Sequence, residues 1–250
     1  FSATGQRWGN PLYDWSGMEL SRLFNIGYDI SEENAEKIWK ETNEKLDMPE
    51  YTAGGLVNCF HAEYLAPCTS IVDSVEGFKE RPNLAPSLRG DDMMDLTPDF
   101  LRILSQTSGV RITDYAACQE AIIKQLDVFH AAGCRFADHA LDNGFEFTDE
   151  GLTRDCVRAV LEGEELLETE HRAFMSEMLR FLAKEYKKRG WVLQLHIGAE
   201  RFTSSRLRMI AGPAGGFAGI GNTVNVKALV KLLDVLEQDL GELPKIILYN

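Results

Sequence analysis

One histidine and two arginines follow a short apolar segment in the second half of this 250-residue chain. A basic stretch ends at Gly190, residues 191–195 form an apolar run, and His196 then precedes a Gly-Ala turn, with Arg201 and Arg206 just beyond it. This order is typical of a buried parallel strand whose carboxyl end presents chemical groups. Because the planar guanidinium of arginine matches a carboxylate, the pattern favours an anionic, oxygen-rich substrate. The alternative is a satisfied histidine at a strand end beside two solvated arginines.

Arg89 is a second candidate, because it follows the strand predicted at residues 83–87 and begins an acidic loop. We expect it to project from the carboxyl end of that strand, which is where barrel enzymes place their sites. The alternative is a purely structural ion pair with Asp91 or Asp92.

Asp138 and His139 are neighbours in the strand predicted at residues 134–139. Adjacent side chains of a strand point to opposite faces, so only one of the two can face a site. A carboxylate there could hold a hydroxyl group or orient a proton-transfer group. The alternative is an N-cap of the next helix, a role that Asp138, Asp142 or Asn143 could each fill.

The sequence contains no complete metal-binding motif. HxH, HExxH, CxxC and the acidic EF-hand spacing are all absent. The remaining histidines, at positions 61, 130 and 171, lie far apart, and the last two fall in predicted helices, where packed or solvated roles are expected.

The composition limits the class of partner and the compartment. A net charge of −13 argues against nucleic acid and anionic membrane surfaces. The five scattered cysteines predict free thiols in a reducing compartment. No apolar run approaches the ~20 residues of a membrane helix. We therefore expect a cytoplasmic protein that binds a small molecule.

The pattern of elements changes near residue 53. Residues 1–52 are predicted to be a helical segment, with Ser31 capping a helix whose apolar stripe ends at Leu46. Residues 53–250 alternate short apolar strands with amphipathic helices, which predicts a parallel sheet in an α/β fold. The strands are predicted at residues 63–69, 83–87, 134–139, 191–197 and 245–249, and the clearest helices at 114–132, 168–189 and 226–239. Five strands fit either an open doubly wound sheet or a segment of a (β/α)₈ barrel.

Four motifs in the same order resemble those of uronate isomerases, which belong to the amidohydrolase superfamily. They are GNPLYDWSGMEL at residues 9–20, ADHALD at 137–142, KRGWVLQLHIGAER at 188–201 and LPKIILY at 243–249. The corresponding family patterns are GNPLYHWxxxEL, SDHALD, the same KRGWVxQxHIGAxR and LPKTILY. The resemblance implies a partial (β/α)₈ TIM barrel, about strands two to six, with an N-terminal helical insertion. It also implies that the HxH metal pair and the closing Asp-Ser-Arg of the family lie outside this chain.

The resemblance implies an enzyme that interconverts D-glucuronate and D-fructuronate, or D-galacturonate and D-tagaturonate. It implies catalytic roles for Asp138 and His196, and substrate binding by Arg89, Arg201 and, more weakly, Arg206. The complete enzyme is expected to use a divalent metal, with zinc as the expected ion, held by ligands outside this chain. It is also expected to be able to form a homo-oligomer. This chain alone is expected to be inactive.

Several positions depart from the family patterns and leave other readings open. They are Leu88 and Gly90 in place of Trp and Pro, Ile71 and Val72 in place of two aspartates, and Phe202, Thr203 and Ser204 in place of three asparagines. One alternative is a related amidohydrolase-fold enzyme that acts on another acidic sugar. The other is a non-catalytic carbohydrate-binding remnant.

Overall fold

The computed structural model describes residues 9–141, 146–212, 215–221 and 225–250. The chain divides into two compact units, Phe1–Glu63 and Tyr64–Asn250. This division falls later than the predicted boundary after residue 52. The reason is local: α3 (Ala53–Cys59) packs against the 3-10 helix η1 (Pro49–Tyr51) of the first unit.

The first unit is helical, as predicted. It contains α1 (Pro11–Phe24), α2 (Ala35–Leu46), η1 and α3. Asn10 caps α1, because its side-chain oxygen accepts the backbone N–H of Leu12 at 2.9 Å. A small core of its own, formed by Leu20, Ile26, Ile30 and Ile38, holds the unit together.

The second helix of this unit differs from the prediction in two ways. It begins at Ala35 after Asn34, and Ser31 accepts the backbone N–H of Asn34 at 3.3 Å in the preceding turn instead of capping the helix itself. Only Ile38 of the predicted apolar stripe is fully buried, whereas Trp39 is 69% exposed. The predicted cap was wrong because Asn34, and not Ser31, directly precedes the helix, and the small core of Leu20, Ile26 and Ile30 fully covers the stripe only at Ile38.

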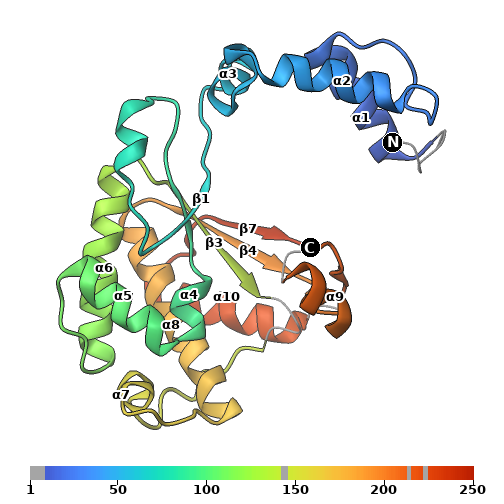
Figure 1. Cartoon of the computed structure of the whole chain (residues 1–250). Helices are drawn as coiled ribbons and strands as arrows, with labels where there is room; N and C mark the ends of the chain where they lie inside the picture. The colour runs from blue at the N-terminus through green and yellow to red at the C-terminus, as the bar shows by residue number, and fades with distance from the viewer. Residues whose placement is uncertain (1–8, 142–145, 213–214, 222–224) are drawn as a thin grey trace. The chain divides into compact units, whose positions relative to one another are not determined.

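The second unit is built on a five-stranded sheet in which every neighbouring pair is parallel (Figure 1). The strands are β1 (Cys68–Ser70), β2 (Ser87–Arg89), β3 (Phe136–Leu141), β4 (Val192–Ile197) and β7 (Ile246–Tyr249), in this spatial order. Neighbours in space follow one another along the chain, apart from the short β5 and β6. A parallel sheet in sequence order with helical connections is the expected arrangement for a segment of a (β/α)₈ barrel.

All five predicted strands are present, with shifted ends. The first two differ most. In the first, predicted at residues 63–69, the ladder begins only at Cys68, and Leu65 makes an isolated bridge with Leu84. The second, predicted at residues 83–87, shares only Ser87 with the observed β2. In addition, Arg89 is the last residue of β2 and not part of the loop after it.

Helices connect the strands, and several of them pack on one face of the sheet (Figure 1). They are α4 (Asp91–Asp95), α5 (Pro98–Ser108), α6 (Tyr115–Ala131), α7 (Cys156–Leu161), α8 (Glu168–Lys188), α9 (Ser205–Ala211) and α10 (Val226–Leu240), with the 3-10 helix η2 (Glu76–Glu80) after β1. The three clearest predicted helices, α6, α8 and α10, agree with the sequence pattern to within two residues at each end. None of the helices in the described part of the chain is long and apolar enough to cross a membrane.

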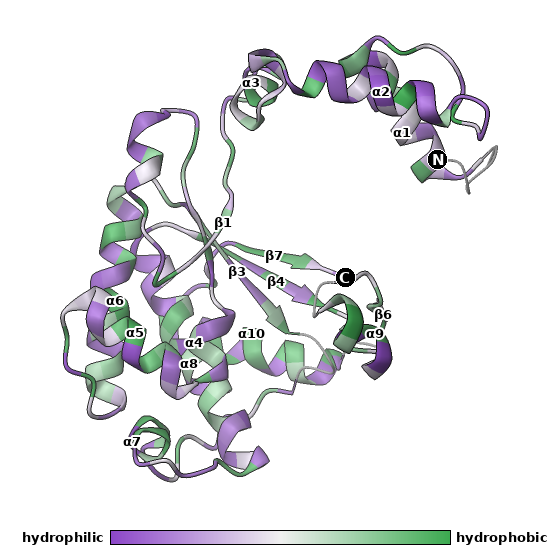
Figure 2. Cartoon of the chain, in the orientation of Figure 1, coloured by the Kyte–Doolittle hydropathy of each residue, from purple (hydrophilic) through white to green (hydrophobic). Residues whose placement is uncertain are grey.

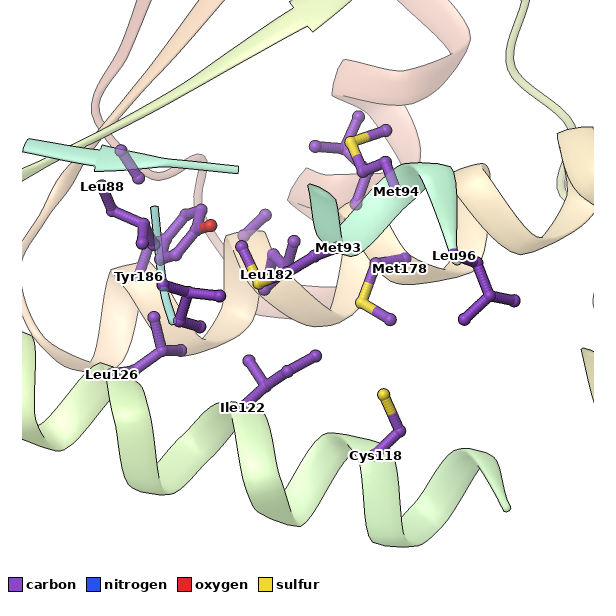
Figure 3. Close-up of a cluster of buried hydrophobic side chains, with 14 of the residues drawn as sticks. Leu88, Met93, Met94, Leu96, Cys118, Ile122, Leu126, Met178, Leu182 and Tyr186 are labelled. Carbon is purple, nitrogen blue, oxygen red and sulfur yellow. The ribbon is translucent and has the colours of Figure 1, made fainter. Parts of the chain in front are cut away.

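The main core lies between the sheet and these helices. Figure 3 shows Leu88 of β2 above side chains from three helices, including Met93 of α4, Ile122 of α6 and Leu182 of α8. On β4, the buried residues are Leu193, Leu195 and Ile197, and they alternate with less buried ones. The sheet therefore has one face closed by helices and one face on which polar side chains stand.

A small antiparallel pair, β5 (Ala199–Glu200) with β6 (Gly219–Ile220), follows β4 directly. The backbone N–H of Gly221 donates to the carbonyl oxygen of Gly198 at 2.7 Å and extends this pairing. The segment that carries Arg201 and Arg206 therefore leaves the sheet through a second, smaller ladder.

Candidate functional site

A row of polar residues crosses four neighbouring strands, at the ends of β1 and β2 and in the middle of β3 and β4. The register pairs Ser70 with Arg89, Arg89 with Asp138, and Asp138 with Gln194. Residues paired in a parallel ladder lie on the same face, so the row faces away from the helices. Figure 2 shows hydrophilic stretches in β3 and β4, whereas β7 is mostly hydrophobic.

Arg89 is held between two carboxylates. Its Nη1 donates to Oδ2 of Asp138, and its Nε donates to Oδ2 of Asp91 at 2.5 Å. Burial alone would lower the pKa of Arg89, but the charges and hydrogen bonds of Asp91 and Asp138 raise it above the ordinary value. The structural alternative of an ion pair with Asp91 is therefore real, and it coexists with the link to the predicted site residue Asp138.

The turn after β2 is fastened to β3 by its backbone as well. The N–H of Gly90 donates to the carbonyl oxygen of Asp138 at 2.8 Å, and Oδ1 of Asp91 accepts the N–H of Ala140 at 2.8 Å. Asp92, the other partner considered for Arg89, instead accepts the hydroxyl of Ser70 at 2.8 Å. These bonds fix the position of the Arg89 guanidinium before any ligand arrives.

Asp138 is 3% exposed and has a second partner besides Arg89. The thiol of Cys68, on β1, donates to Oδ1 of Asp138 at 3.5 Å. Burial and the nearby Asp138 carboxylate raise the pKa of Cys68, so this group is a neutral thiol. Both carboxylate oxygens of Asp138 are thus engaged from one side by neighbouring strands.

His196 lies beside Asp138. It is two residues further along β4 than Gln194, the register partner of Asp138. Its Nε2 is 3.9 Å from Oδ2 of Asp138, and its side chain is 40% exposed. The structure therefore brings together three of the predicted site residues, Arg89, Asp138 and His196, which together span more than a hundred positions of the sequence.

His139 points to the opposite face, as the alternation of strand side chains requires. It is fully buried, and its Nε2 lies 3.0 Å from the hydroxyl of Tyr186 on α8. Burial lowers the pKa of His139 to about 4. The nearby charge of Asp138 opposes this shift, and the charge of Arg89 adds to it; both effects are smaller than that of burial. His139 is consequently a neutral core residue and not part of the polar row. Asp142, an alternative helix cap, lies outside the described residues.

Arg201 and Arg206 lie on the segment that follows β4, and both are exposed. Arg201 comes immediately after β5, and Arg206 is in the first turn of α9, whose N-cap is Ser204. The guanidinium of a third arginine, Arg208, stacks over the ring of Phe202 at 4.0 Å. The roles of Arg201 and Arg206 in substrate binding stay predictions.

The sequence reasoning missed three side chains of this face: Cys68, Gln194 and Tyr249. Gln194 could have been found from the spacing of two along a strand, since it precedes His196 by two positions. Tyr249 is the register partner of His196 on β7, a relation that the sequence does not contain.

A divalent metal does not fit the side chains gathered here. In the described ranges, no group of three or more His, Cys, Asp and Glu side chains is arranged to hold a metal ion. The Asp138 carboxylate, the best single ligand, is already neutralised by the guanidinium of Arg89. The positive charge next to this carboxylate is therefore supplied by the protein itself.

Comparisons with known proteins agree with this fold. The sequence model of the family described as glucuronate isomerase matches residues 2–250. A uronate isomerase of Haemophilus influenzae is 34% identical over 255 residues, which cover 96% of this chain and 54% of that protein. The crystal structure of uronate isomerase from Thermotoga maritima matches with a TM-score of 0.86 and 30% identity, over 97% of this chain and 55% of that one. A glucuronate isomerase structure from Caulobacter crescentus, with a TM-score of 0.83 and 22% identity over 97% of this chain and 52% of that one, supports the fold alone. The chain spans about half the length of the curated relatives it matches.

Proposed function

Because this chain belongs to the glucuronate isomerase family, we propose that it forms the substrate-holding part of an aldose–ketose isomerase for hexuronates. The reaction would convert D-glucuronate to D-fructuronate, or D-galacturonate to D-tagaturonate. The observation that carries this proposal is the convergence of Arg89, Asp138 and His196, from three parallel strands, on the face of the sheet that the helices leave open.

The chemistry sets the requirements of the site. A proton moves between C2 and C1 of the sugar through a cis-enediol, and a second proton moves between O1 and O2. An enzyme accelerates this by placing a base at the C2 hydrogen and by stabilising the charge that develops on the enediolate. The site must therefore combine fixed positive charge, hydroxyl acceptors and a group that can exchange a proton.

The three converging residues meet part of these requirements. Arg89 uses Nε and Nη1 for its two carboxylates, so the Nη2 edge of its fork is the one it offers to a sugar oxygen. Asp138 is a rigid acceptor that orients a hydroxyl. His196, with its partly exposed ring beside Asp138, is the group that exchanges a proton with a sugar oxygen.

We assign recognition of the uronate carboxylate to Arg201, with Arg206 as a weaker contributor. Both are exposed on the segment after β4, and a guanidinium binds a carboxylate in a bidentate fork. The divalent metal of the complete enzyme, with zinc as the expected ion, would polarise the carbonyl and be held by residues outside this chain, as would the base at C2.

Binding of D-glucuronate to the purified chain tests the proposal. We expect the NMR signals of His196 and Arg89 to shift on titration with D-glucuronate, and to shift much less with D-glucose, which has the same hydroxyl pattern without the carboxylate. Equal responses to both sugars would instead indicate a site for neutral carbohydrate and contradict the proposed substrate class.

A second test concerns turnover. With zinc or manganese added, the chain alone is expected to show no conversion of D-glucuronate or D-galacturonate above a protein-free blank. The reason is that the described residues do not supply a metal-binding group. Turnover above the blank would show that these residues already form a complete active site.

A further inference from the structure

Tyr249 lies against the carboxyl end of β4, and its side chain has no role in the chemistry proposed above. Register places Tyr249 of β7 directly beside His196. The two rings are stacked, with centroids 4.5 Å apart and planes inclined by 7°. The Tyr249 hydroxyl reaches back along the strand and donates to Oε1 of Gln194 at 2.7 Å. One residue thus contacts both polar side chains that β4 directs to the open face.

The stacked ring restricts His196. An exposed imidazole on a strand has several accessible orientations, and a parallel aromatic neighbour favours the one in which the two faces touch. In that orientation Nε2 lies 3.9 Å from Oδ2 of Asp138. The Tyr249 ring therefore keeps the proton-exchanging nitrogen next to the carboxylate that orients the substrate.

The hydroxyl restricts Gln194 in a different way. An amide side chain has one accepting end and one donating end. Since Oε1 accepts from Tyr249, the NH₂ group is the end that Gln194 has for a ligand. Gln194 is also the register partner of Asp138, so a donor stands beside an acceptor in the same row.

We propose that Tyr249 is the positioning residue for the β4 side of the site. Its ring orients His196, and its hydroxyl turns the Gln194 amide so that the NH₂ group donates to a substrate oxygen next to the one held by Asp138. The identity of the ligand as a hexuronate rests on the proposed function, whereas the orientation of the two side chains does not.

The orientation is tested in the free chain by NMR of the His196 ring protons, assigned from their loss in His196→Gln. A ring stacked on tyrosine has its protons shifted upfield. We expect this shift to persist in Tyr249→Phe, which keeps the aromatic ring, and to disappear in Tyr249→Leu. The Gln194 side-chain amide signal, assigned from Gln194→Met, should move in both variants because both lose the hydroxyl.

Leu248→Ala is the matched control, because Leu248 lies on the same strand, is 43% exposed where Tyr249 is 42% exposed, and points to the other face. It should leave the His196 signals in place even if β7 is loosened. Identical His196 signals in the wild type and Tyr249→Leu would overturn the stacking part, and an unmoved Gln194 amide in Tyr249→Phe would overturn the hydrogen-bond part.

The effect on binding is measured by titration with D-glucuronate. Tyr249→Phe and Gln194→Met should each weaken binding by about fivefold, which corresponds to the loss of one hydrogen bond of about 1 kcal/mol. Tyr51→Phe, which removes a comparable phenol hydroxyl in the first unit, should bind as the wild type does. Unchanged affinity in the first two variants would overturn the donor role of Gln194. A wild-type chain that does not bind D-glucuronate would reject the proposed function together with this donor role, and the ring-proton result would still decide the role of Tyr249.

Discussion

The two faces of the five-stranded sheet place the same kinds of side chain in opposite environments, one buried and one exposed to solvent. On the helix-covered face, His139 is fully buried and contacts Tyr186. On the open face, His196 is 40% exposed and stacks on Tyr249. Each of these pairs joins one histidine to one tyrosine, through a hydrogen bond on the buried face and through ring stacking on the open face.

This difference shows how the sheet separates stability from chemistry. Burial lowers the pKa of His139 to about 4, so that residue is neutral at physiological pH and serves packing. His196 keeps contact with solvent beside a carboxylate and is accessible to a ligand. Strand alternation assigns these roles to residues on adjacent strands without any change in residue type.

The largest effect on one face alone is expected from a methyl group added at Gly90, in the turn that contacts the buried His139. A Cβ at Gly90 would lie 2.0 Å from Cε1 of the buried His139 ring, which has no room to move. We expect Gly90→Ala to destabilise the second unit by about 3 kcal/mol, the upper end of typical overpacking costs. Chemical denaturation measures this, and Gly77→Ala, whose Cβ would meet nothing within 4 Å, should stay within about 0.5 kcal/mol of the wild type.

The buried histidine also predicts a pH dependence. Between its ordinary pKa of 6.5 and about 4, the unfolded chain binds a proton that folded His139 does not. The contribution of His139 to stability is therefore complete above pH 6.5 and is lost as the pH falls towards 4, by about 3 kcal/mol in all. The free energy of unfolding, measured by chemical denaturation at several pH values in this range, should change less with pH for His139→Gln than for the wild type. His61→Gln, at an exposed position, should leave the slope unchanged.

On the open face, a substitution should alter binding and not folding. Arg201→Ala is expected to weaken D-glucuronate binding by roughly ten- to hundredfold, because a charge-assisted hydrogen bond contributes about 1.5–3 kcal/mol. Arg201→Lys should recover part of this, since a point charge cannot form the bidentate fork. Arg206→Ala should have a smaller effect. Titration calorimetry, accompanied by a melting curve for each variant, measures both quantities; an equal loss for both alanine variants would refute the ranking.

The smallest expected effect is the difference in folding free energy lost when each of the two tyrosines is replaced by phenylalanine. Tyr186→Phe leaves Nε2 of His139 buried without its partner, while Nδ1 already has no hydrogen-bond partner among the described residues. This should cost about 1–2 kcal/mol of folding free energy. Tyr249→Phe removes a hydroxyl from a half-exposed side chain and should cost less than about 0.5 kcal/mol. Equal costs in chemical denaturation would mean that the two faces are not energetically distinct.

The sequence by itself determined the elements and their order. Apolar residues repeated every three to four positions predicted the helices found as α6, α8 and α10, because a helix must bury one face. Short apolar runs predicted all five strands of the parallel sheet. The same reasoning failed for Trp39, since periodicity shows which side of a helix is apolar but not whether anything covers it.

Strand alternation likewise allowed the sequence to separate Asp138 from His139, although the residues alone did not show which of them faces the site. The contacts that define the site were decided only by the tertiary structure. Arg89 and Asp138 meet because β2 and β3 pair in one particular register, and His196 and Tyr249 stack because β4 and β7 do. A register shift of a single residue would send each of these side chains to the opposite face. Register depends on how the helices pack over the whole sheet. Because this packing combines many contacts between distant residues, no local stretch of sequence determines it.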